Sequence, residues 1–213
     1  MPVVLLLTSP VFAADGSMTT EERAYLLDQL TTTKGAMLAS IKGLTAAQWT
    51  FKPAPEVWSV QECAEHIILA ETFIFDGSQA MLKAPEAARL PSATSEVDHQ
   101  IVAMVLDRSH KAQAPEPIVP SGKYPTPESA AKEFIARRDK TIAYVKTTED
   151  PLRVHSGPGP TGSPMDAYQL LLLLAAHSGR HTAQIREVEA NAAYPKGKPT
   201  AALVPLFQRA VFP

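Results

Sequence analysis

The segment LLLLLAAHSGRHTAQI, near the C-terminal end, constrains the fold more than any other part of the chain. Residues 170–176 are apolar on every side, and a helix of that kind has to lie at the centre of a core. His177 and His181 follow in the same helical register, four residues apart. A helix therefore places both imidazoles on one face, about 6 Å apart along its axis. The chain must build its core around a helix that carries two histidines.

Apolar residues recur at helical spacing in four other segments, and proline- or glycine-rich connections separate them. Capping boxes mark the first two starts, Thr19 with Glu22 and Ser59 with Glu62. We interpret Ser163 and Pro164 as the cap and first-turn residue of the last helix. The predicted helical segments cover about residues 19–43, 59–83, 95–111, 126–150 and 163–191. No segment shows the alternation of a strand. We therefore predict an all-α fold, a four-helix bundle with an extra helical segment and Pro-rich connections.

The domain organisation follows from length and composition. A chain of 213 residues with 45% hydrophobic and 20% charged residues supports a single core, which we assign to residues 17–213. Residues 1–16 contain a short apolar run ending in small residues, although no basic residues precede it. This pattern predicts a signal peptide or a flexible N-terminal arm, and the run is too short to span a membrane. We expect an exported or periplasmic protein, with a cytoplasmic location as the alternative.

Several classes of function are excluded by charge and cysteine content. The net charge is −2 and acidic and basic residues are mixed along the chain, so nucleic-acid binding has no support. Cys63 is the single cysteine, which rules out disulfides and zinc sites built from several thiolates. A bound metal would therefore have imidazole and oxygen ligands.

A third histidine, His66, lies on the apolar face of the second predicted helix. Two helices of one bundle can bring His66, His177 and His181 to a common point. Three neutral imidazoles suit a divalent transition metal such as Zn, Ni or Fe. Three protein ligands leave a position for water or substrate, which is typical of catalytic sites. The alternative is a structural bundle in which the histidines bind no metal.

The motifs around these histidines resemble those of the DinB/YfiT-like superfamily. The resemblance rests on WTFKPAPEVWSVQECAEHI, on the HxxxH of residues 177–181 followed by Gln184, and on VHSGPGPTG. It implies a bundle with a divalent metal held by His66, His177 and His181, and often a homodimer. It also implies a small-molecule substrate, with a low-molecular-weight thiol among the candidates, because the family includes thiol-dependent S-transferases and a thiol-dependent isomerase.

The catalytic residues stay unassigned by the sequence, and three side chains are candidates. Glu62 lies one turn before His66 and could accept a hydrogen bond or act as a base, or serve only in its capping box. His155 could line the mouth of the site or lie on the surface. Gln184 could bond a ligand or simply pack. We interpret Cys63 as a small buried hydrophobic residue.

Two functional hypotheses follow. The first is a metalloenzyme that activates a thiol or water at the three-histidine site, as a thiol-dependent S-transferase or a hydrolase. The second is a non-enzymatic, metal-dependent protein that binds a ligand or takes part in a stress response. A coordination sphere with no room for substrate would favour the second.

Overall fold

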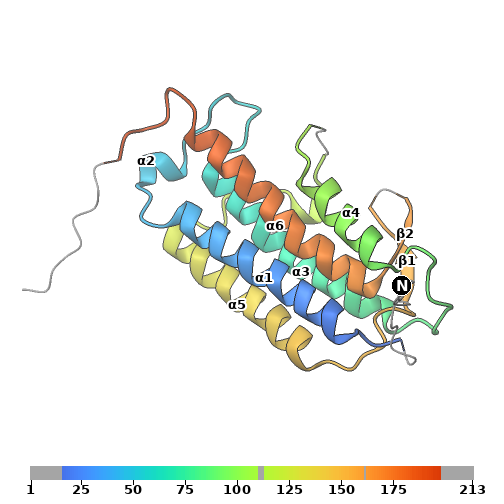
Figure 1. Cartoon of the computed structure of the whole chain (residues 1–213). Coiled ribbons are helices and arrows are strands. Elements are labelled where there is room, and N and C mark those ends of the chain that lie inside the picture. Colours follow the sequence, from blue (N-terminus) through green and yellow to red (C-terminus); the bar gives the residue numbers. More distant parts are fainter. Residues whose placement is uncertain (1–15, 110–112, 161, 198–213) are drawn as a thin grey trace, which may run out of the picture.

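The computed structural model describes residues 16–109, 113–160 and 162–197 (Figure 1). Four long helices form a bundle: α1 (Thr20–Ile41), α3 (Val60–Met81), α5 (Pro127–Thr147) and α6 (Ala167–Glu189). The all-α bundle predicted from the sequence is confirmed. Residues 1–15, which hold nearly all of the predicted signal peptide or arm, lie outside the described residues. No described helix combines the length and the apolar character that crossing a bilayer requires.

The order of the helices around the bundle is α1, α6, α3, α5, because α1 and α3 each pack against both α5 and α6. Helices α1 and α6 begin at the same end, where the Tyr168 hydroxyl donates to the Glu22 carbonyl at 2.9 Å. Helix α5 runs the opposite way, since Arg23 in the first turn of α1 donates to the carbonyls of Val145 and Thr148 at the end of α5. Helix α3 runs parallel to α5, since Gln61 in its first turn donates to the Tyr124 carbonyl just before α5, and Phe75 near its end packs on Tyr144 near the end of α5.

The connection between α3 and α5 has to return along the whole bundle because these helices are parallel. It contains α4 (Ser95–Leu106), which packs on α6, and the 3-10 helix η1 (Glu116–Ile118), which packs on α3 (Figure 1). Helix α4 is the extra segment that the sequence predicts, although it ends five residues earlier than predicted. A short helix, α2 (Ala46–Trp49), lies in the aromatic connection before α3.

The start of α6 differs from the prediction. Pro164–Asp166 forms strand β2, which pairs antiparallel with β1 (Ser156–Pro158), and Asp166 is the N-cap. The Asp166 carboxylate accepts the Gln169 N–H at 2.8 Å, and the Gln169 side chain accepts the Asp166 N–H at 3.2 Å. Asp166, and not Ser163, therefore caps α6. Pro164 lies at the end of the two-stranded hairpin, where its missing N–H costs no hydrogen bond between the strands.

The core consists of two apolar clusters with a buried polar group between them. We call Thr33, Glu71, Arg138 and Ser178 the central polar layer. Arg138 contributes a bidentate ion pair to Glu71, with Nε–Oε2 at 2.9 Å, and both side chains are essentially inaccessible. Arg138 Nη1 donates to Thr33 Oγ1 at 2.8 Å, and Nη2, which also pairs with Glu71, donates to Ser178 Oγ at 2.6 Å. This layer ties all four bundle helices together, and Ser178 directly follows His177 in α6.

Candidate metal centre

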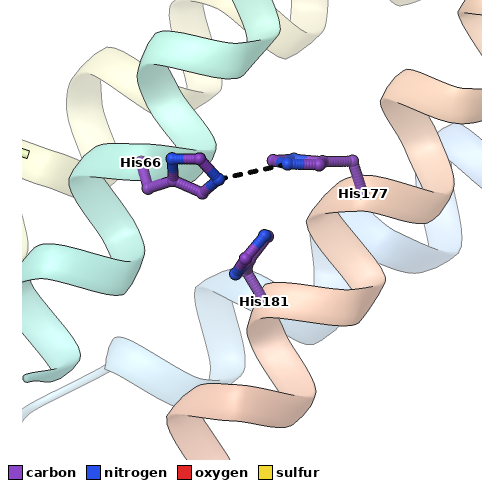
Figure 2. A group of neighbouring side chains, drawn as sticks. All are labelled: His66, His177 and His181. Atoms are coloured by element: carbon purple, nitrogen blue, oxygen red, sulfur yellow. Dashed lines mark hydrogen bonds between the residues drawn. The ribbon is translucent and has the colours of Figure 1, made fainter. Parts of the chain in front are cut away.

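Three histidines meet where α3 packs against α6 (Figure 2). His66 comes from the second turn of α3, and His177 and His181 come from successive turns of α6. One ring nitrogen of each lies within 4.8 Å of those of the other two, and no other such group of three potential ligands occurs among the described residues. Figure 2 shows the three rings projecting from the two helices into one shared space. The side chains predicted as ligands are thus brought together.

The separation between two of the three candidate ligand nitrogens fits a metal ion. His66 Nε2 and His177 Nε2 are 3.2 Å apart. Two nitrogens bound to one tetrahedral ion at about 2.0–2.1 Å lie about 3.3 Å from each other. The spacing already present between His66 and His177 is therefore that of two ligands of one ion.

Hydrogen bonds set which nitrogen faces the centre. His66 Nδ1 lies 2.7 Å from the Ile118 carbonyl oxygen, which can only accept, so Nδ1 carries the proton. His181 Nδ1 lies 2.8 Å from Gln184 Oε1 and donates to it. Both residues consequently present an Nε2 lone pair. Ligating histidines in proteins commonly donate their second N–H to such acceptors.

His177 faces the lone pair of His66, so in the absence of metal the His177 Nε2–H donates to His66 Nε2. For His177 Nε2 to bind a cation at the centre, its proton would move to Nδ1, which frees the Nε2 lone pair. The same geometry thus accounts for the apo hydrogen bond and for a three-nitrogen donor set.

Burial keeps the imidazoles neutral. Desolvation lowers the pKa of His66, against the opposing effect of its bond to Ile118. Desolvation, reinforced by the neighbouring imidazoles, lowers the pKa of His177 well below its ordinary value. Desolvation and the proximity of His66 lower the pKa of His181 to about 3. Neutral imidazole is the form that binds metal. At neutral pH, His66 and His181 therefore present their Nε2 lone pairs, and His177 does so once its proton moves to Nδ1.

Trp58 forms a wall of the site that the sequence reasoning did not assign. Its partly buried indole lies against His66, with ring centroids 4.8 Å apart, and against His181 at 6.1 Å. Cys63 lies one turn before His66 but is fully buried, and burial raises the pKa of its thiol to about 12. The interpretation of Cys63 as a small hydrophobic residue is confirmed.

The three catalytic candidates have different positions. Glu62 accepts the Ser59 N–H at 2.7 Å in the capping box and pairs with Lys52 at 2.9 Å. Burial alone would raise the pKa of Glu62, but these two partners outweigh it and lower the pKa. The carboxylate is therefore ionised and engaged by its cap and by Lys52.

Of the other two candidates, His155 lies away from the histidine cluster and Gln184 lies within it. His155 is buried rather than on the surface, and its carbonyl accepts the Ala167 N–H at the start of α6. The ten residues from Ala167 to His177 correspond to about 15 Å of helix, so His155 lies outside the histidine cluster. Gln184 bonds His181 directly and so belongs to the centre.

The backbone acceptor of His66 could not be found from the sequence. Ile118 lies 52 residues from His66 along the chain, and it acts through its main-chain carbonyl. Every residue has such a carbonyl, so no side-chain pattern signals it.

Comparisons with known proteins agree with the fold of this chain. The family model of the DinB superfamily matches residues 29–185. The uncharacterized protein YuaE of Bacillus subtilis (strain 168) is 23% identical over 150 residues, which covers 70% of this chain and 88% of that protein. The structure of YfiT from Bacillus subtilis superposes with a TM-score of 0.54 at 14% identity, over 85% of this chain and 91% of that one. YfiT is described as a probable metal-dependent hydrolase with an unusual four-helix bundle topology.

Proposed function

The chain belongs to the DinB superfamily, and we propose that it is a metal-dependent hydrolase whose divalent ion is held by His66, His177 and His181. The observation that carries the proposal is the convergence of three neutral imidazoles, two of them with Nε2 freed by an acceptor on Nδ1. The description of the structurally similar YfiT as a probable metal-dependent hydrolase supports the same class.

A divalent ion in this position would supply Lewis-acid activation of water, or of a thiol, at neutral pH. Zinc, nickel and iron all accept a set of three imidazoles, and such a set leaves a position open to a small-molecule substrate. Other residues of the chain orient the imidazoles and cover the site. Gln184 and the Ile118 carbonyl hold two rings in orientation, and Trp58 shields one side of the cluster from water.

Metal content is the first test. Protein purified without an affinity tag is analysed for bound elements, then stripped with a chelator and titrated with Zn²⁺, Ni²⁺ and Fe²⁺. We expect His181→Ala to lose most of the metal because it removes one of three donors. His99→Ala is the matched control, since His99 is an exposed histidine outside the cluster. Full occupancy in His181→Ala would refute the ligand assignment.

Reaction class is the second test. Metal-loaded protein is assayed on panels of esters, amides and activated electrophiles, with and without low-molecular-weight thiols. A hydrolase turns over in buffer alone. A thiol-dependent S-transferase loses turnover when the thiol is omitted. Stoichiometric metal with no turnover under either condition would favour the non-enzymatic binding protein.

A further inference from the structure

Glu65, the residue before His66 in α3, is completely buried. Its Oε1 accepts the Ser121 N–H at 2.9 Å and the Ser121 hydroxyl at 3.0 Å. Its Oε2 accepts the N–H groups of Gly122 at 2.8 Å and Lys123 at 3.0 Å. Within the described part of the chain, no lysine or arginine forms an ion pair with Glu65. A buried carboxylate is costly, and here three backbone amides and one hydroxyl compensate for the lost hydration.

The backbone that Glu65 holds leads directly to the acceptor of His66. Two residues, Val119 and Pro120, separate Ser121 from Ile118, and the proline ring fixes one backbone dihedral in this short link. The Ile118 carbonyl is the group that accepts His66 Nδ1–H at 2.7 Å. A displacement of Ser121 would therefore be passed to the carbonyl that orients the imidazole.

The same stretch is fastened at its other end. The Tyr124 carbonyl accepts Trp49 Nε1–H at 3.1 Å and the Gln61 side-chain N–H at 2.9 Å. Residues 118–124, which we call the strap, are thus bound to α2 and α3 at their start, middle and end. Glu65 provides the middle attachment, the one with the most hydrogen bonds.

We propose that Glu65 is a positioning residue for the metal centre, acting through the strap to hold the Ile118 carbonyl on His66. The inference rests on the proposed function, because it treats His66 as a metal ligand. Glu65 does not contact the three imidazole nitrogens that face the centre. Its role is to keep the proton of His66 on Nδ1, so that the Nε2 lone pair is aimed at the ion.

The substitution Glu65→Gln tests the role of the carboxylate with little change in size. The amide NH₂ would face either two backbone N–H groups or the Ser121 N–H and hydroxyl, so donors would oppose donors. We expect the strap to shift and His66 to populate both neutral tautomers. Zn²⁺ affinity should fall about 10- to 100-fold, the usual cost of losing the acceptor of a ligating histidine.

The direct readout is the tautomer of His66 in metal-free protein, from long-range ¹H–¹⁵N correlation spectra. Wild type should show a single Nδ1–H tautomer, and Glu65→Gln a mixture. Zn²⁺ affinity is measured in parallel by competition with a chromophoric chelator. Asp98→Asn is the matched control, because Asp98 is an equally buried carboxylate that contacts Arg153 and Gln169 instead of the strap. It should lose stability but keep the His66 spectrum and the affinity.

A second variant covers the possibility that Glu65→Gln does not fold. Pro120→Gly loosens the link between Ser121 and Ile118 without touching the core, and should change the tautomer and the affinity in the same direction by a smaller factor. An unchanged His66 tautomer and an affinity within about threefold of wild type, in either folded variant, would overturn the proposal, since such a factor is below the usual range. Absence of metal binding in wild type would instead refute the proposed function, while the tautomer measurement would still decide the role of Glu65.

Discussion

Replacing Arg138 with methionine should be among the most destabilising single changes in this protein. Methionine keeps much of the apolar stem but removes every hydrogen bond that the guanidinium makes to Glu71, Ser178, Thr33 and the Leu30 carbonyl. Glu71 would then stay buried, with a side-chain exposure of 1% and the Ser178 hydroxyl as its remaining donor in the layer. Breaking a buried ion pair in this way costs about 3–5 kcal/mol.

The measurement is the free energy of unfolding in urea, with thermal melting as a second probe. In a protein of this size, about 1 kcal/mol corresponds to about 2–4 °C, so the melting temperature should fall by about 6–20 °C. Arg137→Met is the control, because Arg137 is the next residue along α5 but pairs with Glu133 near the surface. That variant should lose about 1 kcal/mol or less from its ion pair.

The double variant Arg138→Met with Glu71→Leu separates charge from packing. Replacing both partners by apolar residues removes the stranded carboxylate, so most of the lost stability should return. A single variant within about 1 kcal/mol of wild type would refute the argument, because such a value is below the cost of an unpaired buried charge. If the double variant is no more stable than the single one, the lost stability is due to packing and not to the unpaired charge.

Three further outcomes are expected. Gln184→Leu removes the acceptor of His181 Nδ1 and should weaken Zn²⁺ binding about 10-fold or more in a chelator competition, whereas Gln184→Glu should retain it. Binding of Cu²⁺ or Ni²⁺ should quench the fluorescence of Trp58, which lines the centre; the quenching should persist in Trp49→Phe and vanish in Trp58→Phe. Burial raises the pKa of Asp166 to about 6, so its contribution to stability is present below about pH 4 and is lost as the pH rises through about 6. The difference in unfolding free energy between wild type and Asp166→Asn should follow that curve, and a pH-independent difference would contradict it.

The features that the sequence predicts correctly are local ones. Capping boxes at Thr19 and Ser59 span three residues, and helical periodicity repeats within each segment, so both are visible without knowledge of the fold. The histidine pair of α6 is local in the same sense. His66 could be assigned to the same candidate site as His177 and His181 because it lies on an apolar helix face. A bundle of this size has a single core in which such faces meet.

The features that the sequence does not reveal depend on contacts between distant segments. The sequence predicts that α6 is capped by Ser163, but the observed N-cap is Asp166. The difference arises because residues 164–166 pair with residues 156–158 in the β1–β2 hairpin and so cannot be helical. The strap depends on hydrogen bonds between groups more than 50 residues apart, most of them made by the main chain. Side-chain patterns carry no information about such bonds.

The energetic cost of the histidine cluster supports the proposed metal site. Three imidazoles held neutral at a helix interface contribute less to stability than leucines of similar volume would, because their nitrogens lose hydration. The protein nevertheless adds acceptors, at Ile118 and Gln184, that fix two rings with Nε2 toward a common point. A purely structural hydrogen bond between His66 and His177 would need no such arrangement at His181. Orientation of these two rings before any ion arrives lowers the entropy cost of binding an ion, as expected of a metal site.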